Sequence, residues 1–453
     1  MATAYLQRTL TGGNQRTFTI SFWVKRNALG TGTMISYAQT PGNTSHARGY
    51  MNFASDALYF AFNPTGSSWW SYNVSNRLFR DTSAWYHLVA RVDTTDASAS
   101  NRLKIYVNGE QQTLNSTIGT QDLETGWNNN SYTLRVGEYA GDGGENFDGQ
   151  FAHFYYVDGT AYDASTFGET DSTTGIWKPK LSPTITYGTN GFLLKFENSA
   201  AMGTDSGGSN NLTVSGTVTK LIDTPTNVFA TLNPSDIGYT SNLTLSNNNN
   251  TTNQTSNWGD YGIRSTLAAT TGKYYWEAKI ATSNTLCIIP METRLVVNLS
   301  DGSPANDLYG VQRYSDSTTN IYNDGTFTQN SSAMWGGITS SDIISFALDL
   351  DNGKLFLAKN GDYKNTSGAT GDPVNGTNPT FTISDTTKTY GFYTEMRGND
   401  NNGTLMNFGN GYFGTTPVTS AQNPDDGRGI FEYDVPAGYR ALCTKSINAE
   451  EYS

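Results

Sequence analysis

The sequence is poor in charge, cysteine and histidine. Only 15% of its 453 residues are charged, and it contains two cysteines and three histidines. No C-x-x-C motif or Cys/His cluster is present, so the metal sites built from such motifs are excluded. The cysteines, Cys287 and Cys443, leave two alternatives, a disulfide or two free thiols. Because free cysteine is among the most buried residue types, we expect two buried thiols.

Positive charge is scarce as well. Lysine and arginine number 28 against 40 acidic residues, which gives a net charge of -12. Proteins that bind nucleic acid through its phosphates need a stripe of Lys and Arg, and none is found. The sequence therefore predicts no nucleic-acid partner.

Long apolar segments are also missing. No run approaches the ~18 apolar residues of a membrane span, and Met1–Leu10 lacks the basic and apolar regions of a secretory signal. Helical periodicity is confined to a short segment near residues 164–168. We therefore expect a soluble protein, made in the cytoplasm without a signal peptide and not inserted into a membrane.

The residues that are abundant favour strands and turns. Gly numbers 47 and aromatic residues reach 13%, with Asn, Thr and Ser filling many polar positions. In residues 16–25 apolar and polar side chains alternate, which predicts a strand with one buried face. Asn108–Gly109 and Asn360–Gly361 each follow a short apolar run, as in a two-residue hairpin turn.

Length and composition predict two large domains. The tracts 199–223 and 241–258 are rich in Gly, Ser, Asn and Thr and cannot build a core. We place the domain boundary after residue 223, giving domains 1–223 and 224–453. The predicted fold class is all-β, with two antiparallel β-sandwich (jelly-roll) domains joined by a polar Gly/Ser/Asn-rich linker. Residues 448–453 are predicted to form a solvated tail.

Several sequence phrases resemble known families. Four phrases in the first half, in the expected order, resemble laminin-G-like, concanavalin A-like jelly rolls: residues 18–25, 85–93, 104–109 and 147–154. Three in the second half are similar to a SPRY domain: residues 272–278, 342–349 and 354–361. Four others resemble virion proteins of tailed phages, many of them marine or cyanophage-like: residues 174–180, 187–192, 229–234 and 436–443.

These resemblances imply a protein of the virion surface, on a tail fibre or the capsid exterior. The expected partners are other virion subunits, a host cell-surface glycan or protein, and further copies of the chain, with a trimer favoured. Two roles stay open: a tail fibre or adhesin subunit, and a capsid decoration or tail-appendage connector.

A third role, glycan hydrolysis, needs two suitably spaced carboxylates on one strand. The nearest candidate pairs Glu145 with Asp148, but Gly149 and Gln150 stand where a second Glu is required. The histidines His46, His87 and His153 lack a neighbouring motif that would orient them, and we expect structural roles for all three. The sequence thus predicts a protein that is not an enzyme.

Exposed aromatic side chains on loops are the candidates for ligand binding, because they can stack on a sugar ring. Trp69 and Trp70 are adjacent and cannot share one face of a strand. Trp127 lies in a similar polar loop, and Trp335 lies in a loop that resembles the partner-binding loops of SPRY domains. For all four, packing within the protein is the alternative.

Laminin-G-like domains often hold a calcium ion at the rim of the sandwich, where carboxylate oxygens suit a hard cation. By that resemblance the candidate donors are Asp142, Glu145 and Asp148, with Asp93 and Asp96 as further donors. A glycine-rich loop with solvated acids is the alternative, and the composition of residues 141–148 favours it.

Overall fold

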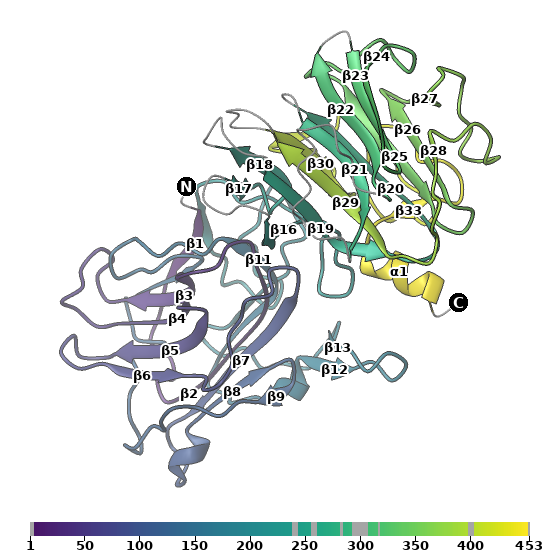
Figure 1. Ribbon diagram of the computed structural model, residues 1–453. Coiled ribbons are helices and arrows are strands. Elements are labelled where there is room, and N and C mark those ends of the chain that lie inside the picture. Colours follow the sequence, from purple (N-terminus) through teal and green to yellow (C-terminus); the bar gives the residue numbers. More distant parts are fainter. Residues whose placement is uncertain are drawn as a thin grey trace. The chain divides into compact units, whose positions relative to one another are not determined.

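The computed structural model describes residues 4–237, 243–254, 261–280, 284–291, 307–315, 318–396 and 403–451. The chain divides into two compact units, Met1–Thr226 and Asn227–Ser453 (Figure 1). The sequence places the domain boundary three residues earlier, after residue 223. Each unit is described here by itself.

The first unit contains two antiparallel sheets. Sheet A has seven strands in the order β15 (Thr213–Ser215), β1 (Tyr5–Thr9), β10 (Thr133–Val136), β3 (Gly32–Ala38), β4 (Arg48–Ala54), β5 (Ala57–Asn63) and β6 (Trp70–Asn73). Sheet B has six strands in the order β14 (Phe192–Leu194), β11 (Gly149–Asp158), β2 (Thr17–Arg26), β7 (Trp85–Asp93), β8 (Leu103–Val107) and β9 (Glu110–Gln111). The short 3-10 helices are η1 (Ala99–Asn101) and η2 (Ala164–Thr166).

The core of this unit lies between the two sheets. The alternation in residues 16–25 sends Phe18, Ile20 and Phe22 inward, where each is fully buried with apolar residues of sheet A. At the turn between β8 and β9, Asn108 and Gly109 adopt φ of 50° and 84°, as a type I′ hairpin turn requires.

The outer face of sheet B is covered by the segment that follows β11, residues 160–226, here called the extension. Phe167 and Trp177 of the extension pack with Val89 and Tyr155 of the sheet. The extension also forms the hairpin of β12 (Gly168–Thr170) and β13 (Trp177–Pro179). The expectation that residues 16–25 have one solvated face is therefore wrong, because the polar side chains of that face lie beneath the extension.

A buried ion pair joins the end of the extension to sheet B. Lys25 Nζ lies 2.7 Å from Asp223 Oδ2, and both side chains are nearly inaccessible. Trp85 Nε1 donates a hydrogen bond to the other carboxylate oxygen at 3.4 Å. Residues up to 223 thus belong to the first unit as packed structure, although their composition predicted a linker.

The second unit also contains two packed sheets. One has seven strands in the order β16 (Leu232–Ile237), β19 (Tyr261–Ala269), β29 (Tyr390–Met396), β21 (Asn284–Pro290), β22 (Tyr309–Ser315), β23 (Thr318–Asn323) and β24 (Thr326–Ser331). The other has nine in the order β17 (Leu243–Ser246), β18 (Thr251–Gln254), β30 (Thr404–Asn407), β20 (Lys273–Ile280), β25 (Ile343–Asp349), β26 (Lys354–Lys359) and β27 (Asp362–Lys364), with β28 (Phe381–Thr382) on β26 and β33 (Arg440–Ala441) on β20. β31 (Tyr412–Phe413) pairs with β32 (Thr416–Pro417).

A buried carboxylate fixes the C-terminal segment against β20. Glu277 accepts hydrogen bonds from Tyr275 and Asn407 and from the backbone amides of Glu432 and Tyr433, at 2.9 to 3.1 Å. Burial raises the pKa of this carboxyl, against the lowering effect of the four donors. Beyond this segment the chain ends in helix α1 (Thr444–Glu451), so the predicted solvated tail is helical as far as residue 451.

The all-β fold class with antiparallel β-sandwiches is confirmed. Cys287 and Cys443 are two buried free thiols, as expected. Within the described part of the chain, no helix has the length and apolar character needed to cross a membrane.

Candidate functional site

The face of sheet A that points away from sheet B is the candidate site, and it is here called the open face. Residues paired across antiparallel strands share a face, and Ser36, Tyr50 and Ala61 are paired in register. Their neighbours Tyr37 and Met51 point the other way, into the core. The extension covers the outer face of sheet B. On the open face of sheet A, by contrast, loop residues such as Trp69 and Tyr139 lie against the strands.

An aromatic cluster occupies the middle of this face, formed by Arg48, Tyr50, Trp69 and Tyr139 and here called the Tyr50 cluster. The Tyr50 ring lies 5.4 Å from the Trp69 ring, tilted by 48°, and 5.4 Å from the Tyr139 ring in an edge-on arrangement. Trp69 is 42% exposed, so much of its indole surface stays available to a ligand.

Arg48 supports the cluster from below. Its guanidinium lies 4.8 Å from the Trp69 ring, its Nε donates to the Tyr139 hydroxyl at 2.8 Å and its Nη1 donates to the His46 carbonyl at 2.8 Å. Among the described residues Arg48 makes no ion pair. A planar cation held by stacking and two hydrogen bonds loses little entropy when it binds a further acceptor.

Polar groups border the cluster on the side of strand β4. Glu145 Oε2 accepts hydrogen bonds from Thr33 Oγ1 at 3.2 Å and from Asn52 Nδ2 at 3.4 Å. Burial, with the nearby Glu145 carboxylate as a second cause, raises the pKa of Tyr50. Burial also raises the pKa of Tyr139 to about 12, so both hydroxyls are neutral hydrogen-bonding groups at neutral pH.

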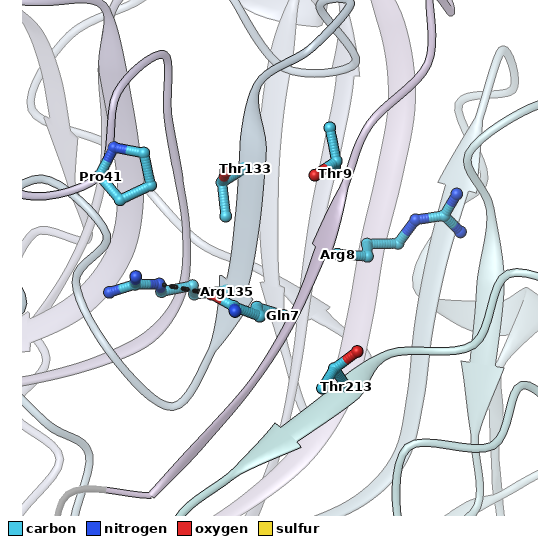
Figure 2. Close-up of a pocket in the computed structure, with 7 residues that line it drawn as sticks. All are labelled: Gln7, Arg8, Thr9, Pro41, Thr133, Arg135 and Thr213. Carbon is cyan, nitrogen blue, oxygen red and sulfur yellow. Dashed lines mark hydrogen bonds between the residues drawn. The ribbon is translucent and has the colours of Figure 1, made fainter.

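A polar pocket of about 350 Å³ opens on the same face nearer the edge of the sheet. Figure 2 shows its lining, which comes from strands β1, β10 and β15 and from the loop after β3. The lining residues are Gln7, Arg8, Thr9, Pro41, Thr133, Arg135 and Thr213. Arg135 Nε donates to Gln7 Oε1 at 3.2 Å, and its Nη1 pairs with Glu138 at 2.5 Å.

The four tryptophans proposed from the sequence have different surroundings. Trp69 and Trp70 do lie on opposite faces, since Trp70 stacks on Phe62 at the edge of the core. Trp335 is partly buried against the core of the second unit and donates from Nε1 to the Asp362 carbonyl. The expectation of an exposed Trp127 is wrong, because its ring is fully buried between Tyr37 and Phe60. A ring without accessible surface cannot stack on a ligand.

The carboxylates proposed for calcium do not converge. Asp142 accepts a hydrogen bond from the Gly144 amide and Asp148 accepts one from Asn27 Nδ2, whereas Glu145 faces Asn52 and Thr33. In the parts of the chain that the structure describes, no group of three or more His, Cys, Asp or Glu side chains is placed to hold a metal ion. The glycine-rich loop with separately solvated acids matches this geometry better.

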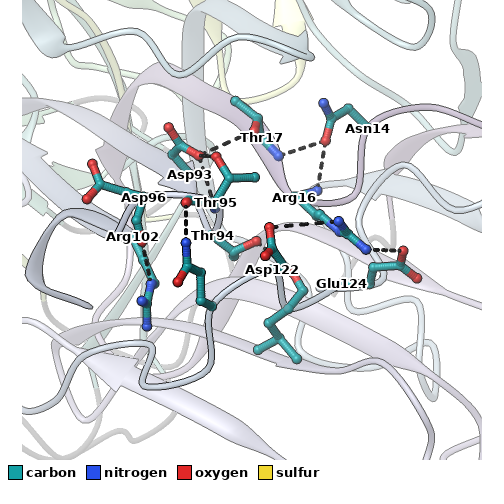
Figure 3. Close-up of polar contacts among 12 residues, drawn as sticks. Asn14, Arg16, Thr17, Asp93, Thr94, Thr95, Asp96, Arg102, Asp122 and Glu124 are labelled. Carbon is teal, nitrogen blue, oxygen red and sulfur yellow. Dashed lines mark hydrogen bonds and ion pairs between the residues drawn. The ribbon is translucent and has the colours of Figure 1, made fainter. Parts of the chain in front are cut away.

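Asp93 ends β7 and Asp96 lies in the loop that follows, near the buried Arg102 (Figure 3). Asp93 Oδ1 accepts from Thr95, and Asp96 Oδ1 accepts from the Ser98 amide. The buried Arg102 guanidinium donates to four backbone carbonyls, those of residues 96, 97, 118 and 119, at 2.6 to 3.1 Å. These four carbonyl oxygens are therefore already engaged by a cation of the protein itself.

His87 forms a serine–histidine contact that the sequence pattern does not show. Its Nε2 lies 3.0 Å from Ser21 Oγ, and Trp177 Nε1 donates to its Nδ1 at 2.9 Å. Because indole nitrogen only donates, Nδ1 must accept and the ring proton lies on Nε2. Nε2 then donates to Ser21 and cannot act as its base. Burial, with His153 as a smaller cause, lowers the pKa of His87 to about 3, which agrees with a structural role.

The described geometry can be compared with known proteins. Residues 2–161 match a family model described as the concanavalin A-like lectin/glucanases superfamily. This part of the chain is similar to concanavalin A-like jelly rolls. The match covers roughly the first third of the chain and ends where the extension begins. The comparison with curated proteins found no match.

Among solved structures, similarity is found to the SPRY domain of human HERC1, at 14% identity over 39% of this chain and 96% of that chain, with a TM-score of 0.28. A heptameric SAP-like pentraxin from Limulus polyphemus is 17% identical over 42% of this chain and 88% of that chain, with a TM-score of 0.29. The CBM40 of the Ruminococcus gnavus IT-sialidase, bound to alpha2,3 sialyllactose, is 11% identical over 32% of this chain and 86% of that chain, with a TM-score of 0.25. At TM-scores below 0.5 these similarities carry no argument about function.

Sequence reasoning found Trp69 but missed the rest of the Tyr50 cluster. Residues 48–54 alternate as clearly as residues 16–25 do, and Arg48 and Tyr50 stand at the outward positions of that strand. Tyr139 lies in a loop, and its contact with Arg48 joins residues 91 positions apart. Alternation could have found the first two residues, whereas the third depends on the fold.

Proposed function

We propose that the chain is a saccharide-binding protein without catalytic activity, and that its ligand binds at the Tyr50 cluster. The observation that carries this proposal is the exposed Trp69 ring, held by Arg48 and Tyr50 beside hydrogen-bonding side chains. An aromatic plate with a few fixed polar groups is the arrangement that suits a sugar, which has apolar ring faces and polar edges. The concanavalin A-like lectin/glucanases match of residues 2–161 supports the same proposal.

The absence of catalysis is part of the proposal. Retaining and inverting glycosidases use two carboxyl groups that flank the scissile bond. Near the cluster, Glu138 is paired with Arg135, and Glu145 accepts hydrogen bonds from Thr33 and Asn52. Burial raises the pKa of Glu138, but the Arg135 guanidinium opposes that rise and occupies the carboxylate. We therefore assign neither carboxylate the role of a general acid.

The biological setting in this proposal is the surface of a tailed phage, with the chain acting as a tail fibre or adhesin subunit that attaches to a host-cell glycan. The phrases at residues 174–180, 187–192, 229–234 and 436–443 are its support. A trimeric assembly and contacts with other virion subunits belong to the same proposal.

The test is binding of the purified chain to a glycan array and to intact candidate host cells. We expect saturable binding that free polysaccharide competes away and that Trp69→Ala abolishes. Leu181→Ala is the matched control, because Leu181 is also an exposed apolar side chain, at 79% exposure, but belongs to the extension. Binding that Trp69→Ala leaves intact would reject the site, and attachment only to purified particles would favour a connector role.

A further inference from the structure

We infer that the polar pocket beside the Tyr50 cluster is a second saccharide subsite, so that the protein recognises an uncharged oligosaccharide chain rather than a single terminal sugar. This inference rests on the proposed function. The inference goes beyond the proposed function because one strand that lines the pocket, β15, lies outside the part of the chain that the family model matches.

The first argument is the position of the pocket in the sheet. Gln7 is paired with Thr213 on one side and with Arg135 on the other, Arg135 is paired with Ser36, and Ser36 is paired with Tyr50. These residues form one row across the open face. Because neighbouring strands lie about 4.8 Å apart, Arg135 and Tyr50 stand about 10 Å apart along the sheet.

The second argument is the unused hydrogen-bonding capacity of the pocket. Among the described residues, the hydroxyls of Thr9, Thr133 and Thr213 make no hydrogen bond to the protein, and Thr9 and Thr133 are paired directly across β1 and β10. Figure 2 shows these side chains beside the Gln7–Arg135 contact. Hydroxyl groups without protein partners suit a ligand that is itself rich in hydroxyls.

The charged side chains near the two sites balance in number, because Arg8, Arg48 and Arg135 lie near Glu138, Asp142 and Glu145. Arg135 is already neutralised by Glu138, and Asp142 and Glu145 stand exposed at the turn that follows. The chain as a whole carries a net charge of -12. A face with balanced charges on a chain of negative net charge offers no net attraction to an anionic polysaccharide, so we expect an uncharged one.

A turn separates the two subsites and sets the minimum length of the ligand. Ser36 Oγ donates to the Glu138 carbonyl at 2.7 Å and accepts from the Ala140 amide at 2.9 Å, so residues 138–140 lie over Ser36. A ligand that reaches both subsites must pass over this turn. It therefore needs several linked sugar units.

The extension supplies one wall of the pocket. Thr213 lies on β15, which pairs with β1 at the edge of sheet A, whereas the family match ends at residue 161. The same segment that covers sheet B thus widens sheet A by one strand. A chain reduced to the matched region would keep the Tyr50 cluster but lose this wall.

The test uses the full chain and uncharged homo-oligosaccharides of glucose, galactose and mannose, each two to eight units long, with affinities measured by titration calorimetry. The variant Thr9→Val/Thr133→Val/Thr213→Val removes three hydroxyls and keeps side-chain shape and strand propensity. The control Thr326→Val/Thr328→Val makes the same change on β24 of the second unit.

For the unaltered chain we expect affinity to rise with length by on the order of tenfold, as one or two further hydrogen bonds form. The triple variant should lose this gain and bind disaccharides unchanged, whereas Trp69→Ala should lose binding at every length. Affinity that is independent of length, or a triple variant that equals the control, would overturn the second subsite and leave the proposed function standing. No binding at any length would overturn both.

Discussion

The buried histidine His87 offers a prediction that can be worked out in full. In the folded chain its pKa is lowered to about 3 from 6.5, because burial disfavours the imidazolium and His153 lies nearby; Nδ1 also accepts a hydrogen bond from Trp177. In the unfolded chain it titrates near 6.5. Between these two values the unfolded state binds one more proton than the folded state, so the stability of the fold decreases as the pH falls below about 6.5.

The magnitude follows from this difference in bound protons. One proton changes the free energy of unfolding by about 1.4 kcal/mol per pH unit. Because the unfolded imidazole is only half protonated at pH 6.5, His87 removes about 2.5 kcal/mol of stability between pH 7 and pH 4.5. For a unit of this size that is a fall of roughly 5–10 °C in melting temperature.

The assay compares the unaltered chain with His87→Gln, whose amide does not titrate. The melting temperature of the first unit should fall further between pH 7 and pH 4.5 in the unaltered chain than in the variant, by the amount just given. His46→Gln, at a half-buried loop histidine, is the control and should behave as the unaltered chain. In NMR spectra of histidine-labelled protein, the His87 ring should keep its proton on Nε2 down to about pH 4. A His87 resonance that titrates near pH 6.5, or equal pH dependence in both chains, would refute the reasoning.

Three further predictions concern stability and metal binding. Lys25→Met should cost about 3–5 kcal/mol of stability in urea denaturation, because it leaves Asp223 buried without its partner. The double variant Lys25→Met/Asp223→Leu should recover most of that loss. A loss under 1 kcal/mol for the single variant would contradict the buried pair. Trp127→Ala should cost about 3–5 kcal/mol by leaving a cavity in the core, measured in the same way, and a cost under 1 kcal/mol would argue for an exposed ring. The melting temperature measured in millimolar calcium should lie within about 1 °C of that measured with a chelator. The reason is that the carboxylate of Asp142 and the other proposed carboxylates do not face a common position for an ion. A rise of several degrees with calcium would mean that the ion binds.

Local pattern was sufficient to predict the strands and their inward side chains. Alternation in residues 16–25 identified the core-facing residues of β2, and Asn108–Gly109 identified a hairpin turn. Both are short-range features, because the side-chain period of a strand and the φ preference of glycine act within a few residues. The two-sandwich fold could therefore be predicted from the chain alone.

Burial on the second face of a sheet could not be predicted in this way. Thr19 and Ser21 read as solvated because they are polar, yet both are fully buried beneath the extension. There Thr19 Oγ1 donates to the Thr160 carbonyl, and Ser21 contacts His87. Polar composition conceals burial when each buried group finds a hydrogen-bond partner. For the same reason the tract 199–223 was interpreted as a linker.

The candidate site was predicted only in part for a related reason. Trp69 and Trp127 stand in similar polar loops, but one covers Arg48 at the surface and the other fills the core. Sequence context does not distinguish these outcomes, since both loops contain Gly, Ser and Asn. The contact between Arg48 and Tyr139 depends on the register of β3, β4 and β10, which is a property of the whole sheet.

The central claim is that the Tyr50 cluster binds a saccharide, and glycan-array binding by three purified proteins tests it most directly. The account predicts that the unaltered chain and Leu181→Ala bind the same uncharged glycans, whereas Trp69→Ala binds none while keeping its melting temperature within a few degrees. Equal binding by Trp69→Ala and the unaltered chain would contradict it.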